Sequence, residues 1–291
     1  MSDLLAILAD ALRIALLTAA APLLGSVLLM AIARLTGARW NGFDSTAAVL
    51  PALAAGGALL GLARIGHEAP DHLKLWMSWW GFGLREVIAG ALVAYAGVRL
   101  RAGAGTNFAA ATVAVYTLLS TLVASDWMLG QVPGHPVSAI GMMLTVEAIG
   151  AAAALLLVTG RGSLRTRRDM TQLMIAAALG LAYLTFMDYL IIWYGNLPSR
   201  VDFYLDRGTP AMAVLAWGAL LVGLAAPIAL LSLVEGERGR RAAGGAVLLG
   251  LLLFNCWWVA GGVAALLLGA LLFVLLGLGT WRLMRREVAH G

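Results

Sequence analysis

Long runs of apolar residues dominate this sequence and constrain its fold more than any other feature. About 20 residues of helix are needed to cross the hydrocarbon core of a bilayer, and stretches near that length recur along the whole chain. Nine segments can be drawn: 11–33, 44–65, 79–99, 107–125, 138–159, 171–194, 210–233, 242–257 and 262–281. We therefore expect an all-α, polytopic transmembrane bundle of about nine helices (eight to ten), forming one integral-membrane domain over residues 1–291.

Composition supports a membrane protein. The chain is 62% hydrophobic and only 12% charged, with a mean hydropathy of +0.90, whereas a soluble domain of this size needs far more surface charge. The last two segments form one apolar block of 40 residues, which is too long for a single span. We expect a turn near "NCWWVAGG" to divide this block into two short helices.

The basic residues are distributed unevenly between the loops. Of the 20 Lys and Arg residues, 14 lie in alternate loops, where cytoplasmic segments are usually enriched in positive charge. These are Arg34, Arg39, Arg99, Arg101, Arg161, Arg165, Arg167, Arg168, Arg238, Arg240, Arg241, Arg282, Arg285 and Arg286. The pattern predicts an N-terminus outside and a C-terminus in the cytoplasm. It indicates contact with membrane lipid, and it does not indicate a nucleic-acid partner.

The inventory of metal-binding residues is sparse. The four histidines, His67, His72, His135 and His290, fall in expected loops or in the tail, whereas a membrane-embedded haem needs ligands deep inside the bundle. The lone cysteine, Cys256, cannot hold an iron–sulfur cluster. The stretch "HEAPDH" (67–72) is a weak candidate for a metal site, and a solvated loop or a partner contact is the favoured interpretation. We expect no metal centre in this chain.

Four ionisable residues fall inside expected spans: Arg85, Glu86, Glu147 and Asp188. Each costs about 3 kcal/mol to place in lipid, so each is a candidate functional residue. In one interpretation, Arg85 pairs with Asp188, Glu86 or Glu147 and holds the helices in register. In the other, Glu147, Asp188 and Glu86 form a proton path or contact a quinol headgroup. The sequence leaves both open.

One stretch resembles a known family. "YLTFMDYLIIWYGNLPSRVDFYLDR", from Tyr183, resembles a signature of the smaller quinone-binding-type membrane subunit of bacterial alternative complex III, within the NrfD-like (polysulfide-reductase membrane-anchor) family. "ASDWMLGQVPGHPVSAIG", from Ala124, is similar to an outer loop of that family. The chain is shorter than typical members, and Met187 and Asp188 stand where the family usually has Ser-Gln.

The resemblance implies a non-haem subunit of a respiratory electron-transfer complex in the bacterial inner membrane, linked to quinol, cytochrome c or an oxidase. It implies four-helix units within about 44–260, followed by a C-terminal helix at 262–281. Quinone or quinol would be the associated cofactor, and cytochrome or iron–sulfur subunits would be the partners. The residues expected to contact quinone or partners on the outer side are Asp126, His135, Trp193, Tyr194, Asn196 and Arg200.

The end of the 171–194 segment is also interpretable from its residues. Trp193 and Tyr194 suit the membrane interface, and Gly195 with Asn196 predicts a left-handed turn that ends the helix. The residues that follow, Arg200, Asp202, Asp206 and Arg207, predict a polar outer loop able to dock a partner. Two alternatives stay open: an assembly subunit without a site, and a secondary transporter that uses Glu147 for proton coupling.

Overall fold

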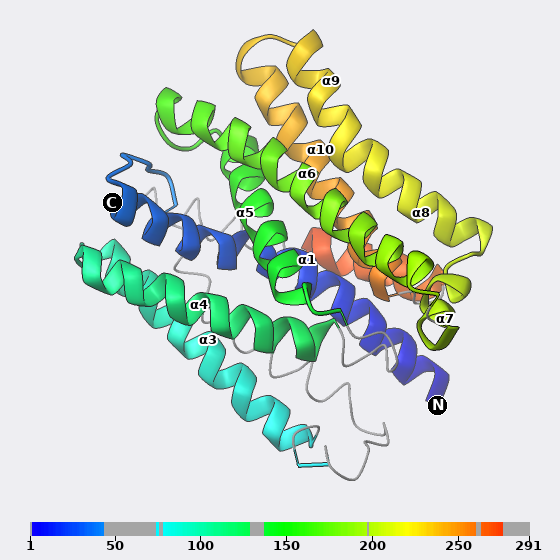
Figure 1. Cartoon of the computed structure of the whole chain (residues 1–291). Helices are drawn as coiled ribbons and strands as arrows, with labels where there is room; N and C mark the ends of the chain where they lie inside the picture. Colours follow the sequence, from blue (N-terminus) through cyan, green and yellow to red (C-terminus); the bar gives the residue numbers. More distant parts are fainter. Residues whose placement is uncertain are drawn as a thin grey trace.

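The computed structural model describes residues 2–43, 74–75, 78–128, 137–196, 198–259 and 263–275. Within these ranges the chain is helical and contains no strand (Figure 1). The helices are α1 (Ser2–Thr36), α3 (Trp79–Arg101), α4 (Thr106–Trp127), α5 (Ile140–Thr159), α6 (Leu164–Tyr194), α7 (Pro198–Asp206), α8 (Pro210–Leu220), η4 (Leu221–Ala225), α9 (Ala226–Leu233), α10 (Gly236–Val259) and a last helix, Val263–Leu275.

Seven helices in the described part of the chain are long and apolar enough to cross a membrane, which makes this a multi-pass membrane protein. They are α1, α3, α4, α5, α6, α10 and the continuous helix formed by α8, η4 and α9. They confirm seven of the nine expected segments. The segment 44–65 lies outside the described residues, as does the end of 262–281, whose described part is the short helix Val263–Leu275.

Two helix boundaries differ from the sequence-based expectation. Helix α6 begins at Leu164, where the Ser163 side chain accepts a hydrogen bond from the Thr166 amide, and not near residue 171. Helix α10 begins at Gly236 and continues through the "NCWW" stretch to Val259, so it is a full span of 24 residues and not a short helix. Apolar patterning missed these first turns because they carry charged arginines. Arginine is nevertheless a good helix former, so the helices extend through them.

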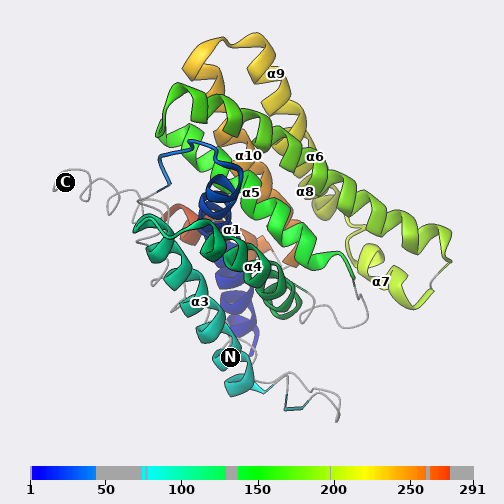
Figure 2. The same cartoon turned by 60° about the vertical axis from the view of Figure 1, so that its left-hand side comes forward.

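The helices run roughly along one direction, so the bundle has two ends (Figures 1 and 2). We call the end that holds the starts of α1, α3 and α5 and the helix α7 the α7 end. The opposite end holds eleven of the 14 arginines above and is called the arginine end; they are Arg34, Arg39, Arg99, Arg101, Arg161, Arg165, Arg167, Arg168, Arg238, Arg240 and Arg241. Several of them lie in the terminal turns of helices.

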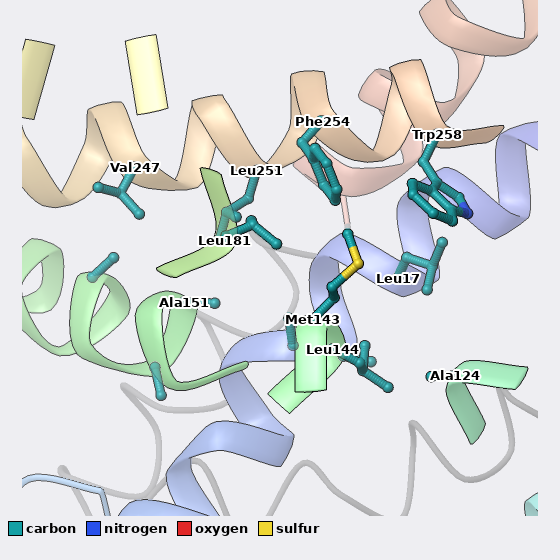
Figure 3. Close-up of a cluster of buried hydrophobic side chains, with 14 of the residues drawn as sticks. Leu17, Ala124, Met143, Leu144, Ala151, Leu181, Val247, Leu251, Phe254 and Trp258 are labelled. Carbon is teal, nitrogen blue, oxygen red and sulfur yellow. The ribbon is translucent and has the colours of Figure 1, made fainter. Parts of the chain in front are cut away.

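Helices α1, α5 and α10 form the centre of the bundle. Helices α3 and α4 pack on one side of this centre, and α6 with α8–α9 lie on the other (Figure 2). Small residues permit the close contact between α1 and α5: a Cβ on Gly25 would overlap the backbone carbonyl of Ala148. Figure 3 shows the core from within, where Leu17 of α1, Met143 of α5 and Phe254 of α10 converge.

Candidate functional site

A large apolar cavity lies between α5, α6, the α8–η4 helix and α10. Its volume is about 490 Å³, within the range of ligand sites for small molecules. Small and aliphatic side chains such as Ala177, Leu181 and Leu251 form its walls. Phe186, Trp217 and Leu220 also line it and are exposed on the outer surface of the bundle. The cavity is therefore open to the surrounding lipid between α6 and α8.

Among the residues that line this cavity, Glu147 carries the carboxyl group. It lies seven residues after the start of α5, about 10 Å along the helix, and only 1% of its surface is exposed. Its Oε1 atom accepts a hydrogen bond of 2.8 Å from Nδ2 of Asn255 on α10. Its Oε2 atom has no hydrogen-bond partner among the described residues. One carboxyl oxygen is held in place, and the other is buried without a partner among the described residues.

A small polar network holds this carboxyl group. The Asn255 amide also donates to the Thr18 hydroxyl at 3.1 Å, and Thr18 donates in turn to the Ile14 carbonyl in α1. The three side chains come from the three central helices, and Thr18 and Asn255 are both at most 1% exposed. The Asn255 Oδ1 atom has no partner within the described part of the chain. The network fixes the orientation of Glu147.

A second polar contact borders the cavity toward the α7 end. Tyr204 lines the cavity and donates a hydrogen bond of 2.6 Å to Oδ2 of Asp188 on α6. Burial raises the pKa of Tyr204, and the hydrogen bond to Asp188 and its negative charge raise it further. The hydroxyl therefore stays protonated and continues to donate. The structure thus places Asp188, through Tyr204, at the same cavity as Glu147.

Helix α7 is held against the bundle by Arg207. The guanidinium lies 3.6 Å above the Phe203 ring and donates from Nε to the Trp257 carbonyl at 3.1 Å. It also donates to the Trp258 carbonyl, so it binds the negative end of the α10 dipole. Burial lowers the pKa of Arg207 to about 10, which leaves it charged at neutral pH. The expected polar outer loop is instead a short helix, and Arg207 is buried.

The wall contributed by α8–α9 contains a widened turn. In η4 the Ala226 amide bonds to the Leu221 carbonyl, five residues earlier, as in a π-helix. The next residue, Pro227, has no amide hydrogen to donate to the carbonyl of Gly223, so the ordinary helical pattern is interrupted there. Gly223 contacts Gly250 of α10 directly, since a Cβ on Gly250 would overlap the Gly223 backbone. Turns of this kind are frequent at functional sites.

The remaining intramembrane charges form a separate cluster on α3 and α4. Arg85 binds both carboxylate oxygens of Asp126 at 2.8 Å. Glu86 is 4% exposed, and its Oε1 atom has no hydrogen-bond partner among the described residues. Asp126, which the sequence suggested as a residue facing quinone or a partner, is buried and forms an ion pair with Arg85. Glu86 does not line the large cavity, so the structure does not bring it together with Glu147 there.

The outer-side residues suggested by the sequence are mostly at the surface. Trp193 and Tyr194 are 65% and 79% exposed, Asn196 is exposed, and Arg200 is half-buried on α7. Asn196 alone takes the left-handed conformation (φ 44°), whereas Gly195 remains right-handed. His135 lies outside the described residues. Patterning missed Thr18, Tyr204 and Asn255, because single hydroxyl or amide groups in apolar segments give little signal.

No known protein family and no curated protein matches the sequence. Among the described residues, no group of three or more His, Cys, Asp and Glu side chains lies close enough together to hold a metal ion.

Proposed function

We propose that this chain is a non-haem membrane subunit of a respiratory electron-transfer complex, and that its large cavity binds a quinone or quinol. The observation that carries the proposal is Glu147. It is a fully buried carboxyl group that lines an apolar cavity open to lipid, and one of its oxygens has no partner among the described residues. A carboxyl group kept in such a place is a functional candidate by default. The resemblance of the Tyr183–Arg207 stretch supports the same function.

The residues fit such a ligand. A quinone has a polar ring with oxygen atoms at opposite sides and a long isoprenoid tail, and it supplies two-electron chemistry coupled to two protons. Glu147 Oε2 can accept a hydrogen bond from a hydroxyl group, or donate one to a carbonyl when protonated. The aliphatic walls and the opening between α6 and α8 suit the tail.

Three side chains would support Glu147 in this role. Asn255 keeps the carboxyl group turned toward the cavity, and Tyr204 with Asp188 forms a second polar contact nearer the α7 end. Together, Glu147 and Asp188 would move protons between the cavity and the aqueous phase at that end. In this proposal the α7 end faces outward from a bacterial inner membrane, and partner subunits carry the redox centres.

The substitution Glu147→Gln tests the proposal. It keeps the size of the side chain but removes the charge and the exchangeable proton, so we expect affinity for quinone to fall by about tenfold to a hundredfold. The protein, with any chains that co-purify, is isolated in mild detergent and its bound lipids are extracted and identified. The quinone of the same membrane is then titrated back by quenching of tryptophan fluorescence.

Glu235→Gln is the matched control, because Glu235 is an exposed carboxylate at the arginine end. It should bind quinone as the unaltered protein does. Extraction of no isoprenoid quinone, with equal titrations for both variants, would overturn the proposal and favour an assembly subunit. Proton-coupled transport by the lone chain in liposomes would favour a secondary transporter instead.

A further inference from the structure

A second, smaller cavity lies on the other side of the bundle, between α1, α3 and α4. Its volume is about 160 Å³, and it is lined by mostly apolar residues that extend along α4 from Phe108 to Leu119. The eleven helical steps from Phe108 to Leu119 correspond to about 16 Å. Leu92, Tyr95 and Val115 line it and are 43%, 52% and 41% exposed, so it is a groove on the outer surface. We call it the α3–α4 groove.

The end of the groove near the turn between α3 and α4 is strongly basic. The Arg99 guanidinium lies 5.7 Å from the centre of the Tyr95 ring and 5.3 Å from that of Phe108, both of which line the groove. Arg34 reaches the same turn from α1, with Nη2 3.9 Å from where a Cβ on Gly103 would lie. No acidic residue occurs in the sequence between Glu86 and Asp126, or between Asp10 and Asp44.

The same turn presents the beginning of a helix. Gly105 precedes α4, and no side chain there accepts a hydrogen bond from the amides of the first turn. Such amides, together with the positive end of the helix dipole, bind phosphate groups well. Two arginines and the start of α4 therefore make a site for an anion directly above an apolar groove.

The groove also contains a polar group that needs a partner. Tyr116 is 4% exposed and lines the groove, and its hydroxyl has no hydrogen-bond partner among the described residues. Side chains on a helix lean toward its N-terminus, so this hydroxyl lies closer to the arginine end than its Cα does. An oxygen atom of a ligand that lies in the groove would be a partner for this hydroxyl.

We infer that the α3–α4 groove binds an anionic glycerophospholipid. Its phosphate lies at Arg34, Arg99 and the first turn of α4, an ester oxygen accepts a hydrogen bond from Tyr116, and an acyl chain lies along the groove. Basic pockets between transmembrane helices commonly bind acidic lipid headgroups. The quinone proposal concerns a different cavity and is independent of this one.

The test measures lipid binding to the purified full-length protein by native mass spectrometry. Phosphatidylglycerol is compared with phosphatidylcholine, and inorganic phosphate provides a headgroup without an acyl chain. The double variant Arg34→Gln/Arg99→Gln should bind phosphatidylglycerol about tenfold or more weakly. Tyr116→Phe should weaken binding about fivefold while keeping the preference for the anionic lipid.

Arg165→Gln/Arg168→Gln is the matched control. It removes the same charge from exposed positions on α6, at the same end of the bundle but away from the groove. It should bind phosphatidylglycerol as the unaltered protein does. Equal binding by the two double variants, or competition by inorganic phosphate alone at the concentration of the lipid, would overturn the inference.

Discussion

Arg207 directly follows helix α7 and fastens it to the end of α10. It binds the last carbonyls of α10 and the Phe203 carbonyl, and its guanidinium covers the Phe203 ring. Tyr204, which borders the large cavity, lies on the same short helix. Because a nine-residue helix is barely stable alone, the position of Tyr204 depends on this arginine.

Replacing Arg207 by Met should destabilise the protein by about 2 kcal/mol or more. The change keeps an apolar stem but leaves buried carbonyls at the end of α10 without their charged donor. Thermal unfolding in detergent, followed by tryptophan fluorescence, measures the loss. Arg200→Met on the more accessible part of α7 should have little effect, and equal midpoints for the two variants would contradict the role given to Arg207. Since the pKa of Arg207 is about 10, the difference should persist from pH 7 to pH 9.

Glu147 illustrates what a sequence reveals about single residues. Its carboxyl group was recognisable because charge is rare in an apolar segment. Its partner, Asn255, was not, because that residue is 108 positions away and only the packing of α5 against α10 brings the two together. One interpretation of the sequence paired Arg85 with Asp188, Glu86 or Glu147. Its partner Asp126 could be identified only once α3 and α4 were placed side by side.

At the scale of helices, the contact between Gly223 and Gly250 determines how closely the α8–η4 helix approaches α10. The backbones touch there, and the residues on either side of the contact form one wall of the large cavity. A glycine on α10 that lies in open space, Gly245, provides a comparison within the same helix.

Gly250→Ala should therefore lower stability by about 1–3 kcal/mol, because the two helices must separate. Gly245→Ala should instead raise it by about 0.5–1 kcal/mol, since alanine favours helix and meets no neighbour. Thermal unfolding of both variants tests the difference, and quinone titration of Gly250→Ala shows whether the cavity changes with it. Equal stability of the two variants would mean that the helices do not approach this closely.

The number and order of helices followed largely from apolar length, but their ends and internal detail did not. Arginine-containing first turns extend α6 and α10 beyond their apolar segments, and η4 depends on how one proline is accommodated. The short helix α7 mixes polar and apolar residues, and this composition led to the prediction of a loop. Hydropathy predicts the part of a helix that contacts lipid, and it does not predict helical turns that lie outside the hydrocarbon core.

At the scale of the whole molecule, the two ends of the bundle differ in charge. The arginine end holds most of the basic residues, and α7 carries Asp202 and Asp206 at the opposite end. The positive-inside rule then predicts that the arginine end faces the cytoplasm. The orientation stays a prediction that the structure of an isolated chain does not test.

Single cysteines test this orientation. Cys256 is buried and is first replaced by Ser, and a new cysteine is then placed at Asp202 or at Arg238, which are both exposed. A membrane-impermeant maleimide should label Asp202→Cys in spheroplasts, and it should label Arg238→Cys only after permeabilisation. The reverse pattern would show that the bundle is inserted the other way.

The central position of α1 has a consequence for biosynthesis. This helix is made before α5 and α10, yet its buried Thr18 binds Asn255, which is synthesised more than 200 residues later. Until then α1 must remain in the bilayer with its polar groups bonded to partners within the same helix. Arg13 binds Asp10 one turn away, and Thr18 and Ser26 donate to their own helix backbone. Helix α1 can therefore stay in lipid until the later helices that surround it have been synthesised.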